Sequence, residues 1–367
     1  MIIGSEMDVF KASEAELNRF LAQNLKQYSR LRNFDFGPDK HNNVSQLSKY
    51  ISHRVIDEYD VVRATLGVST YERAEKFIQE VFWRVYWKGW LEHRPTVWSD
   101  FVAFDQQNKL GSQKDNKNYL AAINGETGIE CFDFWVRELC NTNYLHNHAR
   151  MWFASIWIFT LGLPWQAGAQ FFLKHLLDGD AASNTLGWRW VAGIQTMGKC
   201  YLARAENISK FTDGRFDNAR LNERALPLVD EKIHVVQPID YEVSTKQKFE
   251  TLLIMDSNLN MLNRNETKNY KKIYVMSLAN DSRQIAISHS VAEFKQNLIK
   301  SAVQKHPHCE VLDARQAPQV LGKMSGCDVC YPFIGENLDF LNRSNNVWNI
   351  DLNFIKHYQD LFCWQFA

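Results

Sequence analysis

The sequence lacks an excess of charge of either sign. Lysine plus arginine and aspartate plus glutamate both number 42 among 367 residues, so the formal net charge is zero. A protein that attracts nucleic acid or a membrane surface through its overall electrostatic field carries a net positive charge. We therefore expect any such partner to be bound by a local patch.

The sequence also lacks segments that direct a chain to a membrane. Acidic residues occur within the first six positions, and no apolar run with a small-residue cleavage site follows, so we predict no signal peptide. The longest apolar stretch, residues 151–163, contains Ser155 and Thr160 and is shorter than the roughly 20 residues of a membrane helix. It predicts a buried core helix. We expect a cytoplasmic protein with no membrane contact.

Cysteines are few and scattered. Their number, seven, is odd, which is typical of reduced thiols rather than of a disulfide framework. Cys327 and Cys330 are the only close pair, and no second pair or histidine accompanies them. We interpret this pair as structural and predict no metal site.

Helical patterns dominate the first two thirds of the chain. Ser13 followed by acidic residues predicts an N-cap, and apolar residues then recur with helical spacing. Similar patterns predict helices over residues 71–92, 130–142, 145–161 and 166–177. The first part, residues 1–240, is therefore expected to be an all-helical domain.

The pattern changes after residue 240. Short β-rich runs cover residues 252–256, 272–278, 309–313, 329–334 and 347–352, with helical candidates at 291–303 and 317–324. Strands that alternate with helices predict a mainly parallel sheet. Residues 247–367 are therefore expected to form an α/β domain, and no glycine-rich phosphate-binding motif accompanies it.

One helical segment interleaves indoles, bases and a carboxylate. Glu80, Trp83 and Trp87 fall on one face of the helix predicted over residues 71–92, and Arg84 lies beside them. Indoles beside cations suit nucleobase stacking, which is worth about 1–3 kcal/mol per base. The alternative is a core stripe, which is the commoner role of such residues. An unpaired carboxylate is costly in a core, so Glu80 weakens that alternative.

Three further segments carry polar residues where a cavity could form. Ser45 and Ser48 near a helix start could hold a phosphate, although an ordinary N-cap is the commoner interpretation. Arg150 at the start of an apolar helix needs an anion, and Asp178 and Asp180 are candidates. Taken alone, the Asp-Gly-Asp sequence at 178–180 predicts a turn.

Taken together and in order, these segments resemble the flavin-binding domain of the photolyase/cryptochrome family. The match extends from about Tyr28 to Phe216. Its markers are Tyr28 with Arg32, Ser45 to Ser48, Glu80 to Arg84, Gly125 to Gly128, His146 to Met151, and Asp178 through Asn184 to Trp190.

The resemblance implies an all-helical domain that binds FAD. Asn184 falls where the family sets a side chain against flavin N5, and Arg150 is expected to pair with Asp178 near the flavin ring. Trp188 and Trp165, which are 23 residues apart, match two members of the tryptophan chain that reduces the flavin in light. The expected cofactor-binding residues are Tyr28, Val44, Ser45, Gln46, Leu47, Ser48, Asn147, Arg150, Asp178, Asp180 and Asn184.

The resemblance also implies light-driven repair of cyclobutane pyrimidine dimers in DNA. Enzymes for this lesion pair an asparagine with a methionine, as Asn147 and Met151 do here, whereas (6-4) enzymes have two histidines. A flipped dimer is cheaper to extrude than an intact pair. We expect catalytic roles for Asn184, Glu80, Trp165 and Trp188. The expected DNA or lesion contacts are Arg32, Glu80, Trp83, Arg84, Trp87, Asn147, His148, Met151 and Trp190.

The sequence departs from the family pattern at several places. Val44 replaces a hydroxyl residue beside the phosphates, and His148 replaces an arginine, which makes a DNA contact weaker or dependent on pH. No tryptophan lies between Trp98 and Trp135, where the distal member of the triad belongs, so another indole or Tyr119 is expected to serve.

The order of the domains departs as well. Only about 27 residues precede Tyr28, where the family places an antenna domain, and the α/β segment follows instead. Residues 252–265 loosely resemble the opening strand and loop of that domain, so a permuted antenna domain with a second chromophore of unknown identity and an unrelated partner-binding domain both stay open. Three other functions also stay open: a cryptochrome-like light receptor, repair of (6-4) lesions, and a flavoprotein without photochemistry. We expect a monomer.

Overall fold

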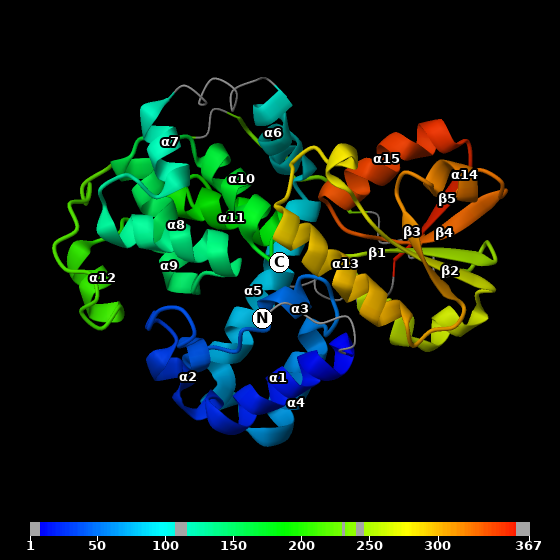
Figure 1. Cartoon of the computed structure of the whole chain (residues 1–367), viewed down its shortest axis with the longest axis horizontal. Coiled ribbons are helices and arrows are strands. Elements are labelled where there is room, and N and C mark those ends of the chain that lie inside the picture. Colours follow the sequence, from blue (N-terminus) through cyan, green and yellow to red (C-terminus); the bar gives the residue numbers. More distant parts are fainter. Residues whose placement is uncertain (1–7, 107–115, 230–231, 240–245, 357–367) are drawn as a thin grey trace.

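The chain folds into a helical part followed by an α/β part (Figure 1). The computed structural model describes residues 8–106, 116–229, 232–239 and 246–356. A π-helical turn over Ile156–Thr160 continues α9. The helices of the first part are α1 (Val9–Gln23), α2 (Leu25–Leu31), α3 (Ser48–Ile51), α4 (Glu58–Val68), α5 (Tyr71–Glu92), α6 (Pro95–Gln106), α7 (Lys117–Asn124), α8 (Glu130–Thr142), α9 (Asn147–Ser155), α10 (Trp165–His175), α11 (Ala181–Ala192) and α12 (Ala205–Phe211).

Local signals explain where several of these helices begin. Asp57 and Asp180 cap α4 and α11, because their carboxylates accept hydrogen bonds from the first free backbone amides. The expected start of the first helix at Ser13 is wrong. Asp8 is the N-cap of α1, and Ser13 lies inside the helix with its hydroxyl bonded to the Phe10 carbonyl oxygen.

The second part is a five-stranded parallel sheet. Its strands are β1 (Thr251–Met255), β2 (Lys272–Ser277), β3 (Cys309–Asp313), β4 (Gly326–Cys330) and β5 (Asp351–Ile355), in the order β3-β2-β1-β4-β5. Leu253 of β1 lies opposite Tyr274 on one side and Val329 on the other. The helices that connect the strands are α13 (His289–Val303), α14 (Ala317–Leu321) and α15 (Glu336–Trp348).

Helices cover both faces of the sheet (Figure 1). Leu252 and Ile254 of β1 pack in a core with α13, whereas Leu253 and Met255 pack in a separate core with α14 and α15. Each residue of β1 is buried, as is usual for a central strand of a parallel sheet.

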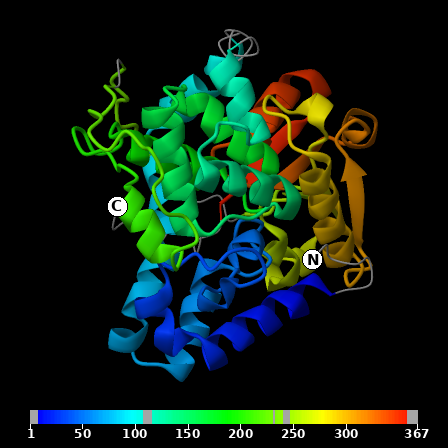
Figure 2. The same ribbon diagram turned by 60° about the vertical axis from the view of Figure 1, so that its left-hand side comes forward.

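The helical part and the sheet share one of their cores. Val9, Leu17 and Phe20 of α1 belong to the same buried cluster as Leu252 and Phe294. The backbone amide of Val9 also donates to Ser301 Oγ of α13 at 2.9 Å. In Figure 2 the first helix runs along the base of the molecule toward the elements of the α/β part. A shared buried core therefore holds the helical part against the α/β part, in addition to the covalent connection of the chain.

Two of the expected strand ranges are wrong at their ends. The strand predicted over 329–334 spans Gly326–Cys330, and Pro332, which has no amide hydrogen for a ladder, follows it. The range 347–352 overlaps the end of α15, so β5 begins only at Asp351. Val347 supplied the apolar signal, but it is 75% exposed at the end of α15.

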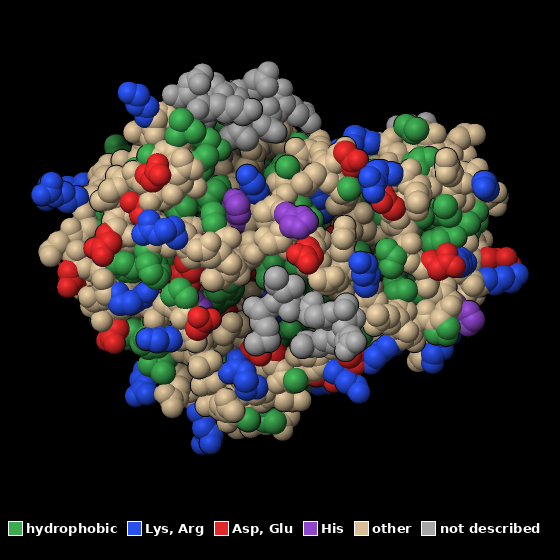
Figure 3. All heavy atoms as spheres, viewed as in Figure 1, with side chains coloured by type: hydrophobic (Ala, Val, Ile, Leu, Met, Phe, Trp, Pro, Cys, Tyr) green, Lys and Arg blue, Asp and Glu red, His purple; other side chains and the backbone are tan. Residues whose placement is uncertain are grey.

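No helix among the described residues is long and apolar enough to cross a membrane. On the face shown in Figure 3, acidic and basic side chains are interspersed, so that face carries no large patch of one sign.

Candidate functional site

A cavity of about 740 Å³ lies among the helices of the first part, with walls from α2, α3, α5, α9, α10 and α11. Cavities of roughly 300–1,000 Å³ are the usual size of small-molecule sites. Every predicted site residue except Trp165 lines it, namely Tyr28, Arg32, Val44, Ser45, Gln46, Leu47, Ser48, Glu80, Trp83, Arg84, Trp87, Asn147, His148, Arg150, Met151, Asp178, Asp180, Asn184, Trp188 and Trp190.

A buried carboxylate with two guanidinium groups forms one wall. Arg150 Nη2 lies 3.0 Å from Asp178 Oδ2, the pairing that the sequence predicts, and Arg84 Nη2 lies 3.6 Å from the same oxygen. Burial alone would raise the pKa of Asp178, but these two cations lower it below its usual value. Asp178 is therefore ionised at neutral pH. Arg84 also donates to Ser52 Oγ, so its position inside the wall does not favour the predicted contact with DNA.

The amide of Asn184 has a fixed orientation. Its nitrogen donates to the Ala169 carbonyl oxygen of α10 at 2.9 Å. Because a carbonyl can only accept, the nitrogen must face Ala169, and the amide oxygen is left as an acceptor. Asn184 lines the cavity and is only 9% exposed, so this oxygen is available to a bound molecule rather than to bulk solvent.

Another part of the lining, beside Asp178, combines hydroxyls with a strained turn. Ser45 and Ser48 flank Gln46, whose φ of 54° lies in the left-handed region that residues other than glycine rarely adopt. Tyr28 packs edge-on against Phe20 and Phe77. Burial raises the pKa of Tyr28, so its phenol stays protonated and can donate a hydrogen bond.

The rim of the cavity carries an exposed aromatic group beside an ion pair. Arg32 Nη1 lies 2.6 Å from Glu80 Oε1, and the Glu80 side chain is 35% exposed. The rings of Trp83 and Trp87 stack with their centroids 5.4 Å apart, and Trp83 is 48% exposed. Trp83 is therefore too exposed to be a core residue, whereas Trp87 is partly buried and packs against the helical core.

His148 lies deeper than a DNA contact would. Its ring stacks on Trp152, Nδ1 lies 2.9 Å from the Asn33 carbonyl oxygen, and Nε2 lies 3.1 Å from Tyr201 Oη. Burial lowers the pKa of His148, so the ring is neutral at pH 7. A neutral ring with both nitrogens engaged does not favour the predicted contact with DNA. Trp190 stacks on Tyr201 and continues the wall.

Several lining residues were not predicted, and one signal could have identified some of them. Tyr86 and Trp90 lie three and seven positions after Trp83, on the same face of α5, and both line the cavity. Tyr144 and Gln195 also line it, but nothing in their sequence context distinguishes them.

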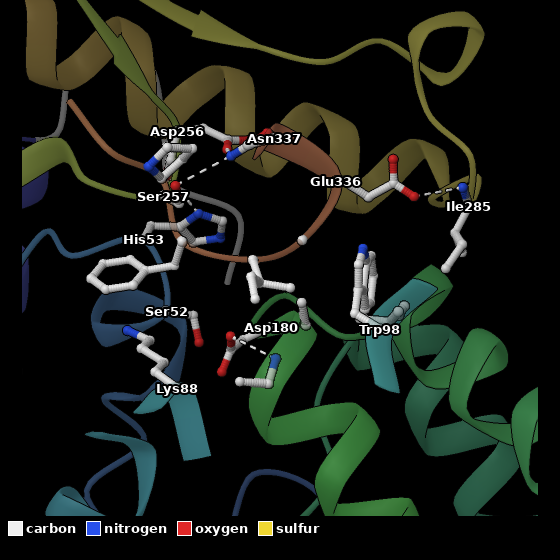
Figure 4. A pocket seen from close by; sticks show the side chains of 18 of the residues that line it. Ser52, His53, Lys88, Trp98, Asp180, Asp256, Ser257, Ile285, Glu336 and Asn337 are labelled. Carbon is white, nitrogen blue, oxygen red and sulfur yellow. Dashed lines mark hydrogen bonds between the residues drawn. The ribbon is translucent and has the colours of Figure 1, made fainter. Parts of the chain in front are cut away.

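A second, smaller cavity of about 110 Å³ lies where the helical part meets the carboxyl ends of β1 and β4 (Figure 4). Asp256 at the end of β1 accepts hydrogen bonds from Lys295 Nζ at 3.0 Å and from Asn337 Nδ2 at 2.8 Å. Asp180 and Gly179 line both cavities, so the loop after α10 is a common wall. At about 30 Å³ per water, this space suits a few waters or a small ion.

Comparisons with known proteins concern the helical part. Residues 77–220 match the family model described as the FAD binding domain of DNA photolyase. A deoxyribodipyrimidine photo-lyase of Vibrio cholerae is 28% identical over 207 residues, which are 55% of this chain and 43% of that protein. One of Agrobacterium fabrum is 32% identical over 186 residues, which are 48% of this chain and 37% of that protein.

Among solved structures, a bacterial class III photolyase from Agrobacterium tumefaciens is 28% identical with a TM-score of 0.48. The match covers 56% of this chain and 42% of that one. This chain spans less than half the length of the curated relatives it matches.

Proposed function

Because residues 77–220 match the family model of the FAD binding domain of DNA photolyase, we propose that the large cavity binds FAD and that the protein splits cyclobutane pyrimidine dimers in DNA under light. The observation that carries this proposal is that one cavity combines residues suited to a flavin with residues suited to a DNA lesion. The buried Arg150–Asp178 pair and Asn184 form its inner wall, while Glu80 and Trp83 form its rim.

The residues of the cavity fit FAD. Its volume of about 740 Å³ lies in the range for a cofactor-sized molecule. Trp188 Nε1 is buried without a hydrogen-bond partner, and the Asn184 oxygen is a free acceptor beside it on α11. Buried polar groups are normally paired, so both atoms suit a ligand with its own polar groups.

Different residues of the lining suit different parts of the cofactor. The hydroxyls of Ser45, Ser48 and Tyr28 can donate to phosphate oxygens, whereas Val44 offers none. The charged Arg150–Asp178 pair would hold the polar edge of a flavin ring, and the Asn184 oxygen would accept a hydrogen bond from N5–H of the reduced ring. That hydrogen bond would favour the reduced cofactor.

Reduced FAD, when bound and excited, supplies one electron to a dimer and recovers it after the ring splits. The protein's own residues bind the lesion and exclude water. Trp83, at the rim, can pack against the flipped bases, and Glu80, held in place by its ion pair with Arg32, can accept a hydrogen bond from a pyrimidine N–H. Asn147 and Met151 line the same space, in the combination expected for cyclobutane dimers.

The test is a repair assay on the FAD-loaded protein reduced with dithionite. Oligothymidine that contains cyclobutane dimers is illuminated with near-ultraviolet light, and recovery of thymine absorbance is followed on single and double strands. We expect recovery, and a slower rate for Glu80→Gln. Glu75→Gln, which removes an exposed carboxylate from the same helix, is the matched control.

The other outcomes separate the alternatives. Repair of (6-4) lesions alone would contradict the assignment made from Asn147 and Met151. Flavin photochemistry without repair of either lesion would contradict the enzyme and favour a light receptor.

A further inference from the structure

A series of oxidisable rings leads from the cavity toward the surface. Trp188 lines the cavity and is 2% exposed. Its ring centroid lies 6.2 Å from that of Trp157, which is fully buried, and Trp157 lies 5.9 Å from Tyr119 of α7. Tyr119 is only partly buried. The three rings therefore connect the cavity wall to a residue that reaches solvent.

The backbone around these rings is arranged for their contact. A Cβ atom on Gly168 of α10 would lie 2.2 Å from Trp188 and 3.0 Å from Trp157, so only glycine leaves room for both indoles. Trp157 itself lies in the π-helical turn, and such turns are rare and often mark functional sites.

Trp165, the second donor expected from the sequence, has different surroundings. Among the described residues, the ring contacts of Trp188 are with Phe153, Trp157 and Phe172 and not with Trp165. Trp165 instead stacks on Phe101, which is much harder to oxidise than tryptophan or tyrosine.

The electrostatic surroundings of Trp165 and Trp157 also differ. The Arg189 guanidinium lies 5.9 Å over the Trp165 ring. A cation attracts a neutral ring but repels an oxidised one, so Arg189 opposes the loss of an electron from Trp165. Trp157 Nε1 donates to the Pro164 carbonyl oxygen at 2.9 Å, and a hydrogen bond of this kind strengthens when the indole becomes positive.

We propose that Trp157 and Tyr119 are the second and third electron donors that reduce the flavin through Trp188. The proposal rests on the proposed function only in that FAD occupies the large cavity. Trp188 gives one electron to the light-excited flavin, Trp157 gives one to oxidised Trp188, and Tyr119 gives one to oxidised Trp157.

Tyr119 then loses its phenolic proton to water and becomes a neutral phenoxyl radical. A thiol in solution returns one hydrogen atom to it, and two thiyl radicals combine as a disulfide. The net result is transfer of one electron from a thiol to the flavin.

The experiment uses the full chain loaded with oxidised FAD and illuminated with blue light. Flavin bleaching is followed with a thiol present, and tyrosyl radicals are detected by electron paramagnetic resonance without it. We expect Trp157→Phe to slow bleaching by at least about tenfold. Trp165→Phe should slow it clearly less. Tyr119→Phe should abolish the tyrosyl signal, whereas Tyr71→Phe, at an exposed tyrosine on α5, should retain it.

Three results would overturn the proposal: a tyrosyl signal that survives Tyr119→Phe, no tyrosyl signal in the unaltered protein, or a larger effect of Trp165→Phe than of Trp157→Phe. Flavin absorbance and thermal unfolding check that each variant is folded. If Trp157→Phe loses FAD, the presence or absence of the tyrosyl signal in Tyr119→Phe tests the proposal, because Tyr119 is only partly buried and its substitution removes a single hydroxyl.

Repair by dithionite-reduced protein separates this proposal from the proposed function. Dithionite bypasses the chain of rings, so Tyr119→Phe should repair as the unaltered protein does. If neither repairs but the tyrosyl signal depends on Tyr119, the proposed function fails and the electron path stands.

Discussion

Under the proposed function, Asn184 is the residue through which the cavity would favour one state of a bound flavin. Ala169 holds its amide nitrogen, so the side chain cannot turn its donor toward the cavity without losing that hydrogen bond. An acceptor at this position stabilises a flavin that carries a proton at N5. It cannot form a hydrogen bond with N5 of an oxidised ring, because that nitrogen is itself an acceptor.

We expect Asn184→Leu to destabilise reduced relative to oxidised flavin. The substitution keeps most of the side-chain volume and removes one hydrogen bond, which contributes about 0.5–1.5 kcal/mol. The midpoint potential, measured by redox titration, should therefore fall, and reoxidation in air should become faster. Asn118→Leu, at an exposed amide on α7, is the control, and an equal potential in both variants would exclude this role for Asn184.

At the residue scale, the sequence is most informative where several polar residues form a motif and least informative about the direction of a single side chain. Arg150 and Asp178 were expected together and lie 3.0 Å apart. Arg84 was grouped with the DNA contacts because it is a base beside indoles, but it turns toward Asp178. Its sequence neighbours do not reveal this, because the carboxylate that attracts it lies 94 positions away.

At the scale of elements, Gly168 of α10 lies directly against the Trp188 ring of α11. An alanine there would force Trp188 or Trp157 to move, since the new methyl group has no free space. Overpacking of this kind usually costs about 1–3 kcal/mol.

We predict that Gly168→Ala lowers the free energy of unfolding by roughly that amount and also slows flavin photoreduction. Gly67→Ala in α4, where nothing lies within 4 Å of the new methyl group, is the control. It should raise stability by up to about 1 kcal/mol through helix propensity. Chemical denaturation and blue-light bleaching measure the two effects. Unchanged bleaching in Gly168→Ala would mean that contact of the two indoles is not required.

Element boundaries were predictable where periodicity and caps agree. Helices over 71–92 and 130–142 were expected and occur as α5 and α8. The end of the chain was less predictable because residues 336–348 are rich in asparagine, a poor helix former, yet tertiary packing holds them as α15. The contact of Trp188 with Trp157 could not be predicted, because a buried aromatic on a core helix has no sequence signature of its neighbours.

At the scale of the whole molecule, His53 connects the helical part to the sheet. Its Nδ1 lies 3.0 Å from the Asp256 carbonyl oxygen and its Nε2 lies 3.2 Å from that of Leu177. Burial, together with nearby Lys295, lowers the pKa of His53 to about 4. The ring is therefore neutral in the folded protein at pH 6, whereas an unfolded histidine near its usual pKa of about 6.5 is largely protonated.

This difference predicts that stability falls on acidification. Between pH 6.5 and about 4, the unfolded chain binds a proton that folded His53 does not, so the free energy of unfolding falls by about 1.4 kcal/mol per pH unit. Above pH 6.5 neither the folded nor the unfolded chain binds this proton, so His53 adds no pH dependence to the free energy of unfolding. His53→Gln should remove this part of the slope in denaturation curves from pH 7 to 5. His289→Gln, at an exposed position, should keep it, and equal slopes in all three proteins would contradict the assignment.

The shared core predicts that the helical part does not fold alone. Removing residues 240–367 would expose the apolar side of α1 that packs with Leu252 and Phe294. We expect residues 1–239 to aggregate or to bind no flavin, as judged by gel filtration and flavin absorbance. A monomeric fragment that binds flavin with unchanged thermal stability would contradict this expectation.

The contact between α1 and α13 sets an order of events during synthesis. About 280 residues separate the end of α1 at Gln23 from the end of α13 at Val303. At about 5–20 residues per second, a ribosome needs roughly 15–60 s to make that interval. During that time the side of α1 that packs against α13 has no partner, although α2 and α4, which also contact α1, have already been made.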